Sequence, residues 1–175
     1  DEVAAAAAVP LGTPLASLDT TAIHDRVRAQ VPAIADVVVT KVWPSTVTLA
    51  VTEWAPKVVL ELPGSWVWIS GEGQSFHTSP ERPEGVIVAR GNLAEEHVLA
   101  TLAAVADDLP PEVREAADHI DAGSVDSVTI TLKDSRRIVW GSAEYAELKA
   151  SVLGPLLKVK AKAYDVSAPT HPPTR

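Results

Sequence analysis

The chain has 175 residues, of which 46% are hydrophobic and 22% are charged, a composition typical of a folded globular protein. Its net charge of -8 argues against nucleic acid as a ligand, because phosphate binding needs a clustered basic surface. The absence of cysteine excludes disulfides, thiolate nucleophiles and zinc–thiolate sites.

Two kinds of targeting segment are missing from the sequence. No apolar run reaches the roughly 20 residues that a membrane helix needs. The N-terminal pair, Asp1-Glu2, lacks the basic region with which a signal peptide begins. Because the chain opens on a predicted helix, we expect it to be part of a longer protein.

Two helices are predicted before residue 33. An acidic start and an Ala-rich run predict the first over residues 1–9. The second is expected to follow a cap at Asp19 or Thr20. Its buried face consists of apolar residues at a spacing of four: Ile23, Val27 and Val31.

Residues 36–56, DVVVTKVWPSTVTLAVTEWAP, predict an antiparallel hairpin. Two β-branched runs flank a turn, in which Pro44 suits the second position of a type I turn. In the second run the apolar residues alternate with threonines, as in a half-buried strand. Pro56 cannot donate to a ladder, so the strand and the first domain are expected to end there.

The rest of the chain predicts short strands with two main helices. Helices are expected after residues 92 and 142, and Gly and Pro pairs mark the turns between strands. The strand candidates are residues 57–61, 66–70, 86–88, 119–122, 125–133, 136–140 and 158–167. Residues 169–175 hold three of the prolines and are predicted to form a disordered tail.

The hairpin carries a family resemblance. The run Val42-Trp43-Pro44-Ser45-Thr46, followed by Val51, Glu53 and Pro56, resembles a stretch of the bacterial cell-division family FtsQ, also called DivIB. Trp54 stands where that family usually has Arg. Weaker matches to the same family occur elsewhere, at Gly12, Leu15, Asp19, Ile23, Gly141 and Lys149.

The resemblance implies an α+β fold with two domains. Residues 1–56 would form a POTRA domain that lacks its first strand, leaving helices and a hairpin. Residues 57–168 would form the FtsQ-type β-domain, a mostly antiparallel sheet with two helices. The resemblance also implies a bacterial source, which we expect to have a GC-rich genome. A cytoplasmic tail, one membrane helix and the first POTRA strand would precede this sequence.

No catalytic site, cofactor or small-molecule substrate is predicted. The tightest cluster of polar residues is Asp118-His119-Ile120-Asp121. In a strand only His119 and Asp121 would share a face, so we interpret the cluster as a solvated strand end rather than a metal site. Trp66 and Trp68 share one strand face. They either form a platform for a partner or a carbohydrate, or fill the gap between sheet and helix.

The last predicted strand, residues 158–167, is the best candidate for a binding site. It has no later strand to pair with, so it is expected to lie at a sheet edge with unpaired backbone groups. A partner could add a strand there, and the lysines could meet acidic partner residues. A solvated lysine row is the alternative. The predicted contact residues are Lys160, Lys162, Ala163, Tyr164, Val166 and Ser167.

The predicted function is that of a non-enzymatic scaffold. By the resemblance, FtsB and FtsL homologues and other divisome proteins are the partners. The same resemblance places the chain at the division septum, outside the cell membrane, to which a single helix would anchor it. Two other functions remain open: a POTRA-type chaperone for exported proteins, and a small cell-wall hydrolase with a convergent pocket of His, Glu or Ser.

Overall fold

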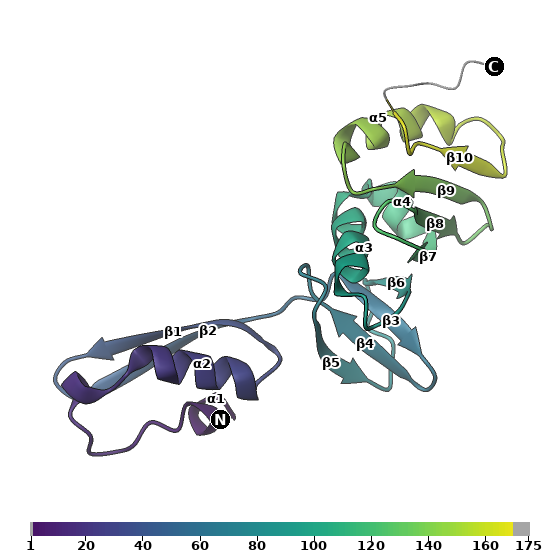
Figure 1. Ribbon diagram of the computed structural model, residues 1–175. Helices are drawn as coiled ribbons and strands as arrows, with labels where there is room; N and C mark the ends of the chain where they lie inside the picture. Colours follow the sequence, from purple (N-terminus) through teal and green to yellow (C-terminus); the bar gives the residue numbers. More distant parts are fainter. Residues whose placement is uncertain (1, 170–175) are drawn as a thin grey trace. The chain divides into compact units, whose positions relative to one another are not determined.

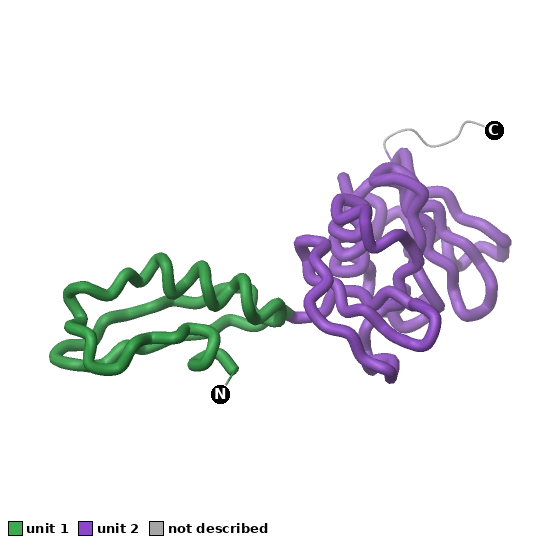
Figure 2. The backbone as a smooth tube through the Cα atoms, turned by 60° about the horizontal axis from the view of Figure 1, so that its bottom comes forward, with its two compact units in different colours: residues 1–54 green, residues 55–175 purple. Residues whose placement is uncertain are grey.

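The computed structural model describes residues 2–169 (Figure 1). The chain forms two compact units, Asp1–Trp54 and Ala55–Arg175 (Figure 2), which are described separately below. Apart from Pro169, the predicted disordered tail lies outside the described residues. In the described part of the chain, no helix has both the length and the apolar character needed to cross a membrane.

Unit 1 consists of two helices and a hairpin. Its elements are α1 (Glu2–Ala7), the 3-10 turn η1 (Leu15–Ser17), α2 (Thr20–Gln30), β1 (Ile34–Val42) and β2 (Thr46–Glu53). The predicted cap is confirmed, because the Asp19 carboxylate accepts hydrogen bonds from the amides of Thr21 and Ala22. The predicted apolar face of α2 is buried, and it packs on β1 with α1 as the core of the unit.

The hairpin of unit 1 is antiparallel, as predicted, and pairs Val37 with Val51 and Val42 with Thr46. Its turn differs from the expectation. Only residues 43–45 lie between the strands, and the peptide bond between Trp43 and Pro44 is cis, whereas a type I turn was expected.

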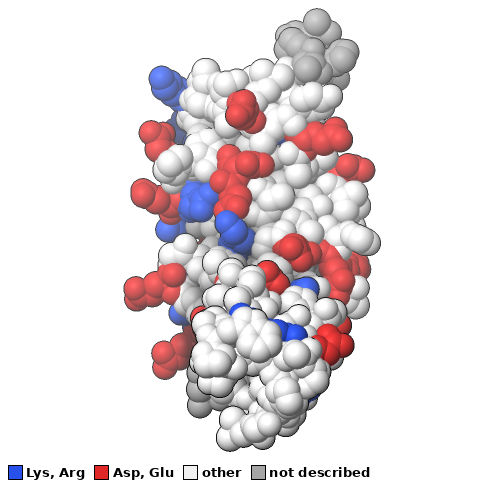
Figure 3. All heavy atoms as spheres, turned by 90° about the vertical axis from the view of Figure 1, so that its left-hand side faces the viewer, with Lys and Arg blue, Asp and Glu red and all other residues white. Residues whose placement is uncertain are grey.

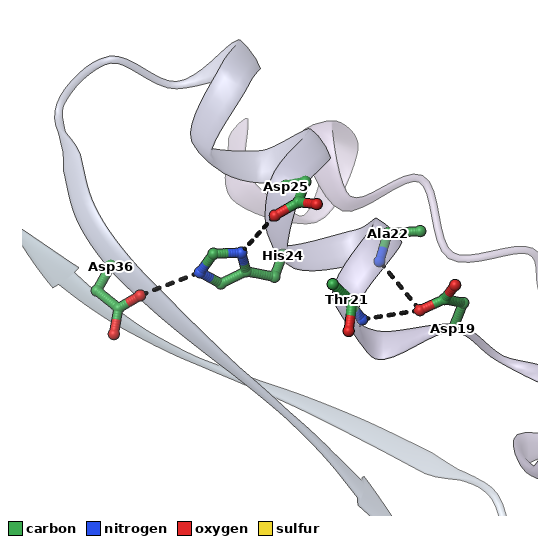
Figure 4. A network of polar contacts seen from close by, with 6 residues as sticks. All are labelled: Asp19, Thr21, Ala22, His24, Asp25 and Asp36. Carbon is green, nitrogen blue, oxygen red and sulfur yellow. Dashed lines mark hydrogen bonds and ion pairs between the residues drawn. The ribbon is translucent and has the colours of Figure 1, made fainter.

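A histidine links the helix and the hairpin of unit 1 (Figure 4). The Nδ1 atom of His24 in α2 lies 2.9 Å from a carboxylate oxygen of Asp25, and its Nε2 atom lies 3.2 Å from one of Asp36 in β1. Both hydrogen bonds raise the pKa of His24 above its ordinary value, and the bond to Asp25 has the larger effect. The bond to His24 lowers the pKa of Asp36.

The two shifts predict an optimum pH for the stability of unit 1. Because the pKa of His24 is raised on folding, its contacts stabilise the fold fully at pH values below the unfolded-state pKa of about 6.5. This stabilisation is lost as the pH rises through the folded-state pKa. Because the pKa of Asp36 is lowered on folding, its carboxylate stabilises the fold at pH values above the unfolded-state pKa of about 3.9. This stabilisation is lost as the pH falls through the folded-state pKa. We therefore expect wild-type unit 1 to lose stability as the pH rises above about 6.5, and we expect His24→Gln to abolish this loss.

Urea unfolding followed by the NMR amide signals of unit 1 measures this effect. His97→Gln, at an exposed position in unit 2, is the matched control and should keep the pH dependence of the wild type. An unchanged pH dependence in His24→Gln would show that the His24 contacts do not contribute to the stability of unit 1.

Unit 2 is built on one eight-stranded sheet. Its strands are β3 (Val58–Leu62), β4 (Ser65–Ile69), β5 (Ser75–Ser79), β6 (Ile87–Arg90), β7 (Ala117–Ala122), β8 (Val128–Leu132), β9 (Arg137–Gly141) and β10 (Ala163–Asp165). Their order is β10-β9-β8-β7-β6-β3-β4-β5. Four of the neighbouring pairs are antiparallel and three are parallel, so the sheet is mixed.

Three helices pack on one face of this sheet: α3 (Glu96–Asp108), α4 (Pro111–Ala116) and α5 (Ala146–Leu156). The short helix α4 was not predicted. All three helices contribute to a core cluster that also contains Leu60, Ile120, Ile130 and Ile138 from four of the strands. The α+β fold class is thus confirmed. Along β3 and β6 the members of the core cluster alternate with residues of the opposite face.

The opposite face of the sheet carries Trp66 and Trp68. They pair with Glu61 and Val59, the residues on either side of Leu60, and neither belongs to the core cluster. The hypothesis that they fill a gap between sheet and helix is therefore wrong. The ring of Trp68 lies 4.8 Å from that of His77. Whether the pair binds a partner stays a hypothesis.

Candidate docking edge

Strand β10 lies at one end of the strand order, as expected for a docking edge, but it is much shorter than predicted. Only Ala163–Asp165 is a strand, and it runs parallel to β9. Residues 158–162, which we expected to continue the strand, form a loop after α5. The alternation of lysines with apolar residues in this segment was therefore misleading. Lys158, Lys160 and the residue between them are all exposed, so the alternation does not mark a buried face.

Two hydrogen bonds show which backbone groups of β10 face outward. The Arg137 amide donates to the Lys162 carbonyl, and the Val166 amide donates to the Val139 carbonyl, both at 3.0 Å. In a parallel ladder, alternate residues bond to the same neighbour. Tyr164 therefore turns both of its backbone groups toward β9, whereas Ala163 and Asp165 turn theirs toward the open side of the sheet.

The side chains of β10 divide in the same way. Tyr164 and Val166 are buried in the core cluster, whereas Ala163, Asp165 and Ser167 are exposed. The Tyr164 hydroxyl donates to the Val159 carbonyl at 2.7 Å and ties down the preceding loop. Tyr164 and Val166 thus hold the strand in place and present no side chain to a partner.

The loop before β10 borders a basic hollow of about 620 Å³. Arg136, Lys158, Lys160 and Lys162 line it together with Asp134. Arg136 bonds to Asp134 at 2.7 Å, and its backbone amide and side chain lower the pKa of that carboxyl. Among the residues that the structure describes, the three lysine ammonium groups form no ion pair, so the hollow has a net positive charge.

Contacts at the C-terminal end of β9 hold the segment next to β10 in place. Gly141 has φ +80°, and a Cβ atom there would lie 2.9 Å from the Cβ of Ser167. Lys149 of α5 is fully buried, and its Nζ donates to the Ser142 carbonyl at 2.8 Å while lying 5.8 Å from the Trp140 ring. Burial lowers the pKa of Lys149. These contacts fix the segment on which the edge strand rests.

One residue of this edge was absent from the predicted contact set. Asp165 directs its backbone outward, and its carboxylate accepts hydrogen bonds from the Ser167 amide at 2.9 Å and hydroxyl at 2.7 Å. This bonding orders Ser167 beside the strand. The sequence held no signal for it, because the outward direction follows from the parallel pairing with β9.

No metal site emerges within residues 2–169, where the structure gathers no three His, Asp or Glu side chains suited to an ion. His119 approaches Asp118 at 2.8 Å and Asp121 at 3.7 Å. We expected Asp118 to point away, and the structure corrects this. The Arg90 guanidinium lies 3.2 Å from the same imidazole, so a positively charged side chain stands beside His119.

Comparison with known proteins places the chain in a family. Residues 1–54 match the family model of the FtsQ-type POTRA domain. The chain is 39% identical to the cell division protein FtsQ of Streptomyces bingchenggensis, over 98% of this chain and 69% of that protein. It is 37% identical to FtsQ of Streptomyces griseus, over 98% of this chain and 88% of that protein.

Two further comparisons are with a longer relative and with a solved structure. The chain is 37% identical to FtsQ of Mycolicibacterium smegmatis, over 98% of this chain and 52% of that protein. Among solved structures, the extracytoplasmic domain of the cell-division protein DivIB from Geobacillus stearothermophilus aligns with a TM-score of 0.44 and 16% identity, over 55% of this chain and 85% of that one. The identities and coverage of the Streptomyces proteins show that this chain belongs to the FtsQ family of bacterial cell-division proteins.

Proposed function

We propose that this protein is a non-enzymatic scaffold of the divisome that docks FtsB and FtsL homologues at β10. It would lie outside the cell membrane at the septum, anchored by a helix that precedes this sequence. The outward-facing backbone of Ala163 and Asp165 at the end of the sheet is the observation that carries the proposal. Membership of a cell-division family favours this role over that of a chaperone for exported proteins.

Strand addition is the binding mode that this edge suits best. A partner strand beside β10 would satisfy the amide and carbonyl groups of Ala163 and Asp165 and extend the eight-stranded sheet. The small Ala163 side chain leaves space for the partner backbone. Ser167, ordered by Asp165, would offer its hydroxyl group at the end of the added strand.

The charge around the edge favours an acidic partner. Lys and Arg outnumber Asp and Glu between residues 133 and 162, whereas the acids strongly outnumber them between residues 55 and 132. Lys160 and Lys162 would meet carboxylates that flank the partner strand. Exposed pairs of this kind chiefly raise the association rate and set the register, and salt should weaken them.

An NMR titration tests the proposal. The isotope-labelled chain would be titrated with the extracytoplasmic segments of FtsB and FtsL from the same organism. We expect amide shifts concentrated on residues 160–167 and on β9, since these groups would contact or neighbour the added strand. Docking at β10 would be contradicted if the shifts were confined to unit 1, or if no shifts appeared at a partner concentration of about 1 mM. That concentration detects even a binding free energy near -4 kcal/mol.

A double charge reversal separates the contribution of the lysines from that of the backbone. Lys160→Glu with Lys162→Glu should slow association and remove most of its salt dependence. Lys41→Glu, in unit 1, is the matched control and should leave both unchanged. Binding that is insensitive to both salt and the double reversal would leave strand pairing as the sole contact and refute the acidic partner surface.

A further inference from the structure

One end of unit 1 carries no ionisable side chain. Residues 3–18 and 42–52 contain no Asp, Glu, Lys, Arg or His, although 22% of the whole chain is charged. The two segments meet around a groove of about 340 Å³, and every residue that lines it comes from one of them. The groove includes Leu11 and Leu15 from the first segment and Val47 and Leu49 from the second. We call this surface the uncharged end.

Large apolar side chains protrude from the uncharged end. Leu11 is 99% exposed, Trp43 at the hairpin turn is 69% exposed and Val42 beside it is 47% exposed. Ser45 of the same turn lines the groove together with Leu11, so the loop and the turn are neighbours. In Figure 3, which views the molecule from the side of the hairpin turn, the lower part of the near surface is almost entirely white. Single exposed apolar residues are ordinary, but several large ones at one end of a unit are typical of an interaction site.

The shape and chemistry of this surface favour a lipid bilayer as the occupant. Leu11 and Trp43 stand out from the surface, as do the apolar side chains that insert into the interfacial layer of a bilayer. Tryptophan prefers the membrane–water interface, where its ring is in an apolar layer and its N–H group reaches water. The rest of unit 1 carries more Asp and Glu than Lys and Arg and would be repelled by anionic headgroups, so the uncharged end is the part of unit 1 best able to approach them.

We propose that the uncharged end of unit 1 rests on the membrane, with Leu11, Val42 and Trp43 inserted into the interfacial layer of the bilayer. This contact would set which end of unit 1 faces the lipid. It is independent of docking at β10, because the residues that carry it belong to the other unit. Three inserted side chains bind weakly, so we expect a transient contact when the chain is free and a lasting one only when it is anchored.

Fluorine NMR of the chain labelled with fluorotryptophan tests this proposal. The sequence holds five tryptophans, each of which gives its own resonance, and Trp43→Phe identifies that of Trp43. The probe is vesicles of phosphatidylcholine and phosphatidylglycerol that contain a gadolinium-chelating lipid. We expect the Trp43 resonance to relax several-fold faster than those of Trp66 and Trp68, the half-buried references in unit 2.

Two variants make the result specific. Leu11→Ser changes a side chain that is almost wholly exposed, so the fold should be retained while the excess relaxation of Trp43 falls. Val125→Ser, at an exposed loop position of unit 2, is the matched control and should change nothing. Equal relaxation of Trp43, Trp66 and Trp68, or an excess that Leu11→Ser leaves intact, would overturn the lipid contact. Perturbation of Trp43 by the protein partners but not by vesicles would overturn it in favour of a protein ligand.

Discussion

Ala163→Pro is expected to abolish partner binding and leave the isolated protein folded. The Ala163 amide faces away from β9, so its loss removes no hydrogen bond from the sheet, and proline is tolerated at the first residue of an edge strand. A partner strand would lose one donor and meet the proline ring where its own backbone must approach. We expect affinity to fall by at least about 100-fold, or about 2.8 kcal/mol, as measured by isothermal titration calorimetry.

The matched control for this change is Ala163→Val. Valine keeps the amide donor and suits an extended backbone, so binding should fall far less than with proline. Tyr164→Pro is unsuitable as a test, because Tyr164 is buried and directs its backbone at β9. If Ala163→Pro bound the partner as tightly as Ala163→Val, strand addition at β10 would be excluded.

Gly73→Ala is expected to cost unit 2 about 3 kcal/mol of its free energy of unfolding, as a sum of backbone strain and overpacking. Gly73 has φ +83°, and an added Cβ would lie 2.3 Å from the Glu96 carbonyl oxygen and 2.7 Å from the Ala100 amide nitrogen. Both are backbone atoms of α3, which cannot yield as a flexible side chain would. Either the helix or the turn before β5 must therefore move.

Gly64→Ala separates the two contributions to this cost. Gly64 has nearly the same φ, +79°, but an added Cβ there would meet no atom within 4 Å. It should cost only the backbone strain, about 1 kcal/mol. Urea unfolding monitored on unit 2 measures both variants. Equal losses for Gly73→Ala and Gly64→Ala would show that the close approach to α3 does not constrain the turn.

Local patterns in the sequence were sufficient for the family and for much of the fold. The hairpin motif around Trp43 and Pro44 identified the FtsQ family, and the comparisons confirm it. The Asp19 cap and the spacing of Ile23 and Val27 predicted α2 correctly. These signals are readable because a cap and a helical period involve residues only a few positions apart.

The candidate site could be predicted only in part. The sequence indicated that the last strand lies at a sheet edge, but it predicted a strand over residues 158–167 where only Ala163–Asp165 forms one. An alternating pattern in this segment describes a possible strand, whereas its actual length depends on where β9 lies alongside it. The bond from Tyr164 to the Val159 carbonyl holds the lysines in a loop, and no local pattern encodes that contact.

The sequence by itself thus determined the family, the α+β class and the helices and hairpin of unit 1, because short-range spacing encodes them. Only the tertiary structure decided that β10 runs parallel to β9 with Ala163 facing outward. It also decided that Trp66 and Trp68 lie opposite the helices, and that residues 3–18 and 42–52 meet at one surface. The physical reason is that pairing and burial join residues far apart in the chain, whereas a sequence pattern describes only neighbours.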